Sequence, residues 1–399
     1  MVNYGLSRVN YQDIFELESK YNSGGVGRRP VAIVRAKGTR LWDSEGNEYI
    51  DCAAAQGWAN VGHSHPVVTA AIQAQAESLV ASQESSYNDV RARWMQELAQ
   101  VLNTSLNWSG CHIHPSNSGT EANEAALKLA RLLTGRTGLV ATRRGFHGRT
   151  MGALSLTWNK KYRQPFEPLV PEVTHVPFNN IEAMTEAIGD ETAAVIVEIV
   201  QGEGGVHPGS TDYFRSLREL CTERGALLII DEIQTGVGRT GRWLACEHHQ
   251  LSPDIVTLGK SIGGGLPLGV TAWRTELGRF KPGLHGSTFG GNPLVCAASR
   301  AVLQVMSAER LPARAAELGE WLTSELQARP SDQIREVRSL GLMIGVELRG
   351  KVTPILEQLM NQGVWALPAG LNVLRLLPPL VIEKGDLEQV IKTIDNVLT

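Results

Sequence analysis

Residues 227–260 read LLIIDEIQTGVGRTGRWLACEHHQLSPDIVTLGK and contain two short apolar runs, 227–230 and 255–258. Each run is followed by a residue whose side chain can take part in catalysis, Asp231 after the first run and Lys260 after the second. A run that is apolar at every position is typical of a parallel strand covered on both faces. Ligands bind at the carboxyl ends of such strands, so we expect Asp231 and Lys260 to project into one crevice.

The same pattern continues outward from this stretch. From about His65 onward, long amphipathic helices alternate with further apolar runs at 139–141 and 194–197. After the glycine-rich residues 286–291 the pattern changes to helices, predicted over 294–306, 313–329 and 384–397, with short strands over 344–348 and 373–376. Before His65 we expect a helix and a hairpin with strands 31–34 and 41–42.

These elements predict an α/β protein with a mostly parallel sheet in a large domain and a smaller α+β domain. We expect three parts: an N-terminal segment, 1–64, that packs with the small domain, a large domain, 65–290, and a small C-terminal domain, 291–399. A chain of 399 residues, 42% of them hydrophobic, is long enough for two cores.

The composition narrows the possible partners. With a net charge of -3 and 20% charged residues, the chain has no excess of positive charge that would attract nucleic acid or an anionic membrane. This favours a small-molecule partner. The sequence shows no signal peptide and no bilayer-spanning run, and its five cysteines are scattered singly, so we expect the cytoplasm. Histidine pairs occur at 63/65, 112/114 and 248/249, but none has a second ligand pair at finger-like spacing, and we predict no metal.

Two nucleotide-binding motifs are matched only in part. Residues 236–241, GVGRTG, fit the G-x-G-x-x-G spacing, but no acidic strand end follows about 20 residues later to bind a ribose. Gly259-Lys260-Ser261 resembles the end of a phosphate loop, yet Asp254 occupies the position of the first glycine that such a loop requires. Both nucleotide interpretations are therefore weak.

A third element points to a phosphorylated cofactor. Residues 116–122, SNSGTEA, form a polar loop that opens a long helix, where free N–H groups and the helix dipole suit a phosphate. Taken singly, this loop could be an ordinary helix cap, and Asp231 and Lys260 could form a buried ion pair. Taken together, a phosphate anchor, a carboxylate for a pyridine nitrogen and a lysine that condenses with an aldehyde indicate pyridoxal 5'-phosphate.

With these motifs in view, the chain resembles the class III aminotransferases along nearly its whole length, and within them the acetylornithine aminotransferase group. The motifs that carry the resemblance are SNSGTEA (116–122), FHGRT (146–150), QGEGG (201–205), DEIQTGVGRTG (231–241), GKSIGGG (259–265) and HGSTFGGNPL (285–294). The resemblance implies fold type I of the pyridoxal-phosphate-dependent transferases and a homodimer.

The resemblance also assigns roles in binding the cofactor. Lys260 is expected to be the Schiff-base lysine, Asp231 the partner of the pyridinium nitrogen, and Gln234 a neighbour of the ring hydroxyl. Phe146 would stack on the ring. The phosphate would be held by Ser118, Gly119 and Thr120, with Thr288 reaching it from the second subunit.

For the substrate, the resemblance implies two anion sites. Arg149 would clamp the α-carboxylate, a bidentate task that suits a guanidinium. Arg375 would be the second anion site, masked by Glu203 until 2-oxoglutarate binds, and Ser287 is also placed in the substrate site. On the residues alone, Arg375 would be read as part of a structural ion pair, and Phe146 as a core aromatic.

The amino donor is predicted from a narrower resemblance. Residues 42–52 (WDSEGNEYIDC) and 157–163 (TWNKKYR) look like enzymes that act on aminoadipate or glutamate semialdehyde attached to a small acidic carrier protein, in lysine or arginine biosynthesis. A basic mouth for the carrier would consist of Arg28, Arg29, Lys160, Lys161 and Arg163, although these residues are equally read as exposed loop charges.

Other substrates remain open. Acetylornithine is the first alternative, followed by ornithine or 4-aminobutyrate, an aminomutase, and a cofactor-binding protein without activity. The chain departs from the familiar pattern at Ile199, where many relatives have proline, and at residues 55–60, where Trp58 could reshape the pocket.

Overall fold

The fold is taken from a computed structural model, which describes residues 10–329 and 331–398. The first nine residues of the expected 1–64 segment therefore lie outside the described residues. Within the described ranges, no helix is both long and apolar enough to cross a membrane.

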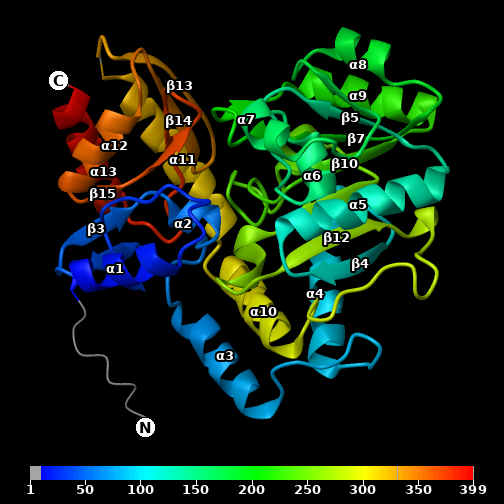
Figure 1. Cartoon of the computed structure of the whole chain (residues 1–399), viewed down its shortest axis with the longest axis horizontal. Coiled ribbons are helices and arrows are strands. Elements are labelled where there is room, and N and C mark those ends of the chain that lie inside the picture. Colours follow the sequence, from blue (N-terminus) through cyan, green and yellow to red (C-terminus); the bar gives the residue numbers. More distant parts are fainter. Residues whose placement is uncertain (1–9, 330, 399) are drawn as a thin grey trace.

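A seven-stranded sheet forms the centre of the larger body (Figure 1). Its order is β4 (Cys111–Ser116), β12 (Gly269–Arg274), β11 (Ile255–Leu258), β10 (Leu227–Asp231), β7 (Thr192–Glu198), β5 (Gly138–Thr142) and β6 (Val173–Val176). β12 is antiparallel to both neighbours, and the other pairs are parallel. The predicted α/β class with a mostly parallel sheet is confirmed.

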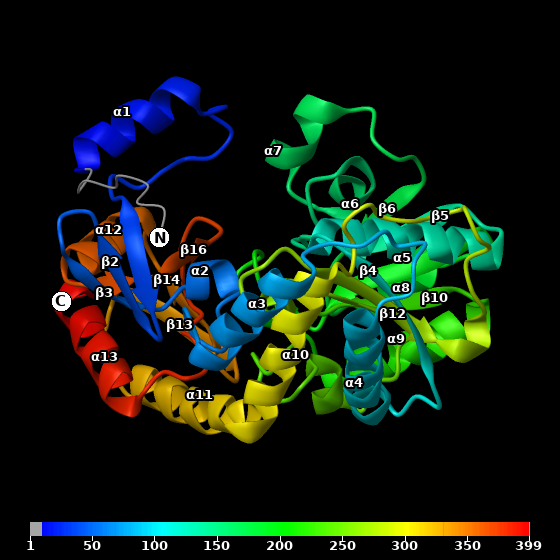
Figure 2. The same cartoon turned by 90° about the horizontal axis from the view of Figure 1, so that it is seen from below.

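Helices cover both faces of this sheet, which explains why its inner strands are mostly apolar. β7 and β11 are buried at each residue. Figure 2 shows α5 above the sheet and α4 and α9 below it. The helices of this body are α3 (Pro66–Ser78), α4 (Asp89–Leu106), α5 (Gly119–Thr134), α6 (Met151–Leu156), α7 (Lys160–Arg163), α8 (Ile181–Ala187) and α9 (Thr211–Arg224).

The C-terminal elements and the N-terminal strands lie together on the left of Figure 1. One four-stranded sheet has the order β13 (Ile334–Leu340), β14 (Met343–Leu348), β17 (Val373–Leu376), β16 (Leu367–Ala369). The other has the order β1 (Ile33–Lys37), β2 (Arg40–Asp43), β3 (Glu48–Asp51), β15 (Val364–Trp365), so the N-terminal hairpin is extended by a C-terminal strand. The helices are α1 (Tyr11–Tyr21), α11 (Leu311–Gln327), α12 (Thr353–Asn361) and α13 (Lys384–Leu398).

Two details differ from the sequence prediction. The first strand begins at Ile33 rather than at residue 31. In addition, α10 (Pro293–Ala308), which was predicted as part of the C-terminal domain, packs against α3 and α4 of the larger body.

A buried arginine connects the two bodies. Arg239 is 1% exposed, and its guanidinium donates to the carbonyl oxygens of Leu342 and Pro378 at 2.9 and 2.6 Å and to Oδ1 of Asn60 at 2.7 Å. Burial lowers the pKa of Arg239 to about 9. The glycine-rich loop 236–241 is a series of turns that presents this arginine, and it does not open a helix as a dinucleotide loop does.

Candidate active site

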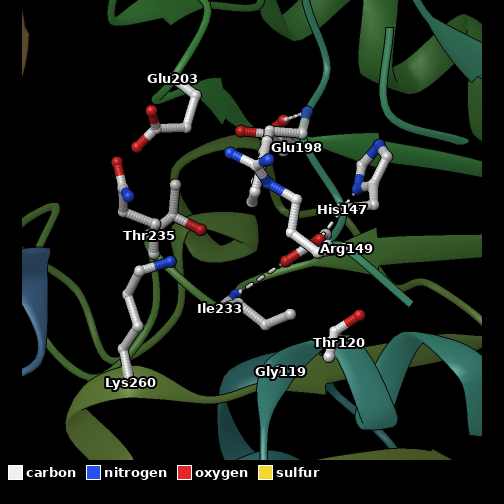
Figure 3. Close-up of a pocket in the computed structure, with 13 residues that line it drawn as sticks. Gly119, Thr120, His147, Arg149, Glu198, Glu203, Ile233, Thr235 and Lys260 are labelled. Carbon is white, nitrogen blue, oxygen red and sulfur yellow. Dashed lines mark hydrogen bonds and ion pairs between the residues drawn. The ribbon is translucent and has the colours of Figure 1, made fainter. Parts of the chain in front are cut away.

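A cavity of about 260 Å³ lies where β10 and β11 end, and residues from six segments line it (Figure 3). The strand ends contribute Asp231 and Lys260, as predicted. The full lining is Gly119, Thr120, Phe146, His147, Gly148, Arg149, Glu198, Glu203, Asp231, Ile233, Gln234, Thr235 and Lys260. The structure thus brings together eight of the predicted site residues, which are Gly119, Thr120, Phe146, Arg149, Glu203, Asp231, Gln234 and Lys260.

Asp231 is held by three N–H donors. Its Oδ2 atom accepts from Asn123 Nδ2 at 2.9 Å and pairs with His147 Nδ1 at 2.8 Å, while Oδ1 accepts from the backbone N–H of Ile233 at 3.0 Å. Burial lowers the pKa of His147, but the hydrogen bond and the charge of Asp231 outweigh it, so that the pKa of His147 is raised. A carboxylate with this many donors is fixed in orientation.

Lys260 points into the cavity (Figure 3). Burial lowers the pKa of Lys260 below its ordinary value, although the nearby carboxylates of Asp231 and Glu203 act in the other direction. A lowered pKa leaves more of the amine neutral and able to attack an aldehyde. Its backbone φ of 46° lies in the left-handed region, a strained conformation for lysine.

The amino end of α5 closes one side of the cavity. Ser118 caps this helix by accepting from the N–H of Glu121 at 3.3 Å, so Gly119 and Thr120 form its first turn. Their backbone N–H groups have no acceptor inside the helix. A Cβ at position 119 would lie 2.8 Å from the side chain of Ile233, so only glycine lets the helix end approach the cavity this closely.

Glu203 and Arg375 meet at the opposite end. Arg375 Nη1 donates to Glu203 Oε1 at 2.6 Å and to Gln234 Oε1 at 3.2 Å, and its side chain is 2% exposed. Burial raises the pKa of Glu203, but the charge of Arg375 outweighs it, so that this pKa is lowered. A Cβ at Gly202 would lie 2.0 Å from Gln234 Oε1, so a larger residue there would displace the Gln234 side chain from its contact with Arg375.

Arg149 has no counter-ion. The structure gives it no hydrogen bond or ion pair with any residue in 10–329 or 331–398. Its guanidinium carbon lies 3.8 Å from the ring centroid of Tyr162 and 5.7 Å from that of Phe146. The two rings are 6.3 Å apart and nearly perpendicular. An exposed guanidinium with free donors at the edge of a cavity is suited to binding an anion.

Four predicted site residues do not line the cavity. Ser118 acts in the helix cap, and Arg375 reaches the cavity only through Glu203 and Gln234. Ser287 Oγ accepts from Asn117 Nδ2 at 3.0 Å, next to the helix cap. The neighbouring Thr288 is exposed in the single chain.

The sequence prediction did not assign a role to Glu198, His147 or Asn123. Glu198 accepts from the backbone N–H groups of Phe146 at 2.8 Å and of Gly202 at 3.0 Å. Burial raises the pKa of Glu198 to about 7, although the nearby His147 lowers it. The signal for Glu198 was present, because it follows the apolar run 194–197 as Asp231 follows the run 227–230.

Residues 54–58, which include part of the segment that departs from the family pattern, also have unusual geometry. Ala54, Ala55, Gln56 and Gly57 all have positive φ, between 40° and 83°, and form a single left-handed turn. A Cβ at Gly57 would touch Lys260, so this turn lies against the lysine stem. The adjacent Trp58 packs over Gly265 rather than into the cavity lining.

A second cavity of about 650 Å³ adjoins the first and shares Phe146 and Glu203 with it. It is lined also by Lys160, Lys161 and Tyr162. Arg163 lies in the same helix, α7, with its guanidinium carbon 5.8 Å from the ring centroid of Trp158, which also lines this cavity. The other two members of the predicted basic mouth lie elsewhere: Arg28 pairs with Glu18, and Arg29 stacks on Trp365 with its guanidinium carbon 4.3 Å from the ring centroid. Among residues 10–329 and 331–398, no group of three or more metal-ligating side chains occurs.

Comparison with known proteins agrees with this site. The family "Aminotransferase class-III" matches residues 21–398. The chain is 46% identical over 385 residues to a [LysW]-aminoadipate semialdehyde transaminase of Deinococcus radiodurans, covering 96% of this chain and 89% of that protein. It is 45% identical to an acetylornithine aminotransferase of Methanopyrus kandleri, covering 97% and 99% of the two chains.

Solved structures give the same result. The ornithine aminotransferase of Toxoplasma gondii, in a structure whose active site holds PLP at partial occupancy, is 33% identical and superimposes with a TM-score of 0.93 over 99% of this chain and 95% of that one. An acetylornithine aminotransferase of Elizabethkingia anophelis is 31% identical, with a TM-score of 0.84 over 98% and 99% of the two chains. The chain therefore belongs to the class III aminotransferases and is a pyridoxal-phosphate-dependent enzyme.

Proposed function

We propose that this aminotransferase exchanges an amino group between an N2-blocked lysine or ornithine and 2-oxoglutarate, in lysine or arginine biosynthesis. The semialdehyde partner is aminoadipate or glutamate semialdehyde attached through its α-nitrogen to a small acidic carrier protein. The names of the Deinococcus and Methanopyrus relatives support an N2-blocked substrate. The observation that carries the proposal is the pairing of Arg375 with Glu203 beside an Arg149 that has no counter-ion among the residues that the structure describes.

Three features of the cavity fit the cofactor. Lys260 supplies an amine of lowered pKa, Asp231 a fixed carboxylate on the opposite side, and α5 two N–H groups without helical acceptors. When bound, pyridoxal phosphate supplies an aldehyde that condenses with amines and a ring that takes up an electron pair from the substrate carbon. We assign the phosphate to Ser118, Gly119 and Thr120, with Thr288 reaching it from a second subunit of a homodimer.

The side chains around the cavity have separate roles toward the bound cofactor. Asp231 would keep a proton on the ring nitrogen of bound cofactor, because a carboxylate fixed by three donors stabilises a positive charge there. Gln234 would lie beside the ring hydroxyl, and Phe146 would cover one face of the ring. Lys260 would hold the cofactor through Nζ and would carry the proton that moves between two carbon atoms.

The two arginines explain how one pocket takes two unlike substrates. Arg149 binds the α-carboxylate of each substrate, with Ser287 of the loop near Asn117 as a further substrate contact. With the blocked donor, Glu203 stays paired with Arg375, so no bare cation faces the aliphatic part of the donor. With 2-oxoglutarate, Glu203 withdraws and Arg375 binds the second carboxylate.

The first experiment is the visible absorbance of the purified protein with cofactor, compared with Lys260→Ala. Wild type should show the absorption of lysine-bound cofactor, and the variant should lack it. Single half-reactions with carrier-attached lysine, acetylornithine and free ornithine then identify the donor. If the absorbance is lost fastest with acetylornithine, the enzyme acts in arginine biosynthesis through the acetylated route. If it is lost fastest with free ornithine, a blocked donor is excluded. Absorbance that is unchanged in the variant would refute the role of Lys260.

A further inference from the structure

The contact between Arg149 and Tyr162 carries an inference beyond the roles given above. Arg149 is exposed at the cavity rim, and its guanidinium carbon lies 3.8 Å from the ring centroid of Tyr162. A guanidinium over an aromatic ring is attracted by the negative face of the ring. Because the contact with Tyr162 is not a hydrogen bond, and the described residues give Arg149 no other hydrogen bond or ion pair, its N–H donors remain free for a carboxylate.

Tyr162 is itself held in place. It lies in the short helix α7, which Asn159 caps by accepting from the N–H of Lys161 at 3.0 Å. The segment before α7 is fastened to the segment that carries Arg149: the N–H of Trp158 donates to the Gly145 carbonyl at 2.9 Å, and the N–H of His147 donates to Thr157 Oγ1 at 2.9 Å. The backbone that carries Tyr162 is therefore anchored to the segment that carries Arg149.

We propose that Tyr162 is a positioning residue for substrate binding, which holds Arg149 ready for the α-carboxylate; this rests on the proposed function of Arg149. A long arginine side chain loses rotamer freedom when it binds an anion, and that loss weakens binding. Tyr162 restricts the side chain before the substrate arrives. Tyr162 also lines the second cavity, so the Arg149 side chain is restricted at the boundary between the two cavities.

The test compares Tyr162→Leu and Tyr162→Met, which lack a π face, with Tyr162→Phe, which keeps it. We expect the Leu and Met variants to raise KM for both glutamate and 2-oxoglutarate about three- to tenfold, with kcat within about twofold of wild type. Tyr162→Phe should match wild type. The half-reaction with propylamine, which has no carboxylate, should be unchanged in all three variants.

The controls separate this proposal from the role of Arg149. Phe166→Leu removes an exposed aromatic side chain from the 3-10 helix that follows α7 and should leave KM unchanged. Arg149→Lys should raise KM on its own, and adding Tyr162→Leu should raise it no further, because the tyrosine acts through the arginine.

Each other outcome overturns a specific claim. If Arg149→Lys raises KM and the Leu and Met variants do not, Tyr162 has no positioning role. If Tyr162→Phe is as impaired as Tyr162→Leu, the hydroxyl rather than the ring face is required, and the proposal is wrong. If Arg149→Lys leaves KM unchanged, the role of Arg149 in the proposed function fails as well. Additive effects in the double variant would show that Tyr162 acts independently of Arg149.

Discussion

The Nδ1 atom of His147 lies 2.8 Å from Oδ2 of Asp231, and both side chains are buried. We predict that His147→Leu slows the half-reaction with glutamate about tenfold or more, since a hydrogen bond to a charged group contributes roughly 1.5–3 kcal/mol. The physical reason is that Asp231 would keep only two of its three donors. Single-turnover kinetics with saturating cofactor measure this rate.

His147→Gln serves as the matched variant, because its amide can still donate to the carboxylate. It should recover part of the lost rate. Equal rates in His147→Leu and wild type would mean that Asn123 and the Ile233 backbone suffice to orient Asp231.

The second prediction concerns the pH dependence of stability. Burial raises the pKa of Glu198 to about 7, from an ordinary value of 4.5. A raised folded-state pKa contributes stability that is complete below pH 4.5 and is lost as the pH rises through 7. Between pH 5 and pH 8, wild type should therefore lose about 3 kcal/mol of unfolding free energy relative to Glu198→Gln, which cannot ionise.

Urea unfolding of the cofactor-free protein at several pH values measures this difference. Glu77→Gln, at an exposed position of α3, should follow wild type at each pH. A difference between wild type and Glu198→Gln that stays constant with pH would show that Glu198 does not titrate in this range.

The third prediction tests the pair formed by Glu203 and Arg375. Glu203→Gln removes the charge that masks Arg375, so glutamate, with two carboxylates, should bind better and the blocked donor worse. We expect kcat/KM for glutamate relative to acetylornithine to rise about tenfold. Arg375→Leu should do the reverse and raise KM for 2-oxoglutarate. Glu336→Gln, which changes an exposed glutamate paired with Arg338, should leave the ratio unchanged.

The fourth prediction concerns the carrier. Lys160 and Lys161 line the second cavity, whereas Arg28 and Arg29 are engaged within the chain. We expect Lys160→Glu/Lys161→Glu to raise KM for carrier-attached lysine about tenfold at low salt, because complementary charge steers association, and to leave acetylornithine unaffected. Lys351→Glu, at an exposed position before α12, is the charge-matched control. Equal effects on both donors would argue against a carrier surface here.

The central sheet could be predicted because the burial of each strand determines which residues that strand can contain. A strand buried on both faces must be apolar throughout, so runs such as 227–230 and 255–258 predicted β10 and β11, and Asp231 and Lys260 followed from their ends. The sequence did not predict that β12 is antiparallel to its neighbours, because its residues are buried in the same way whichever direction the strand runs.

Other parts of the site depend on pairing between distant residues. Arg375 and Glu203 are 172 positions apart, and only the family resemblance linked them before the structure placed them 2.6 Å apart. The left-handed turn at residues 54–57 was not predicted, because three of its residues are not glycine and no local signal favours positive φ for alanine.

The buried guanidinium of Arg239 has a consequence for how the chain melts. It binds carbonyl groups from residues 342 and 378 and the side chain of Asn60, so loop 236–241 is fastened to both the early and the late parts of the sequence. Separating these parts would strand a charged group without acceptors in an apolar interior. Fragments cut near residue 290 should therefore not fold alone, and the calorimetric trace of the intact chain should contain a single peak.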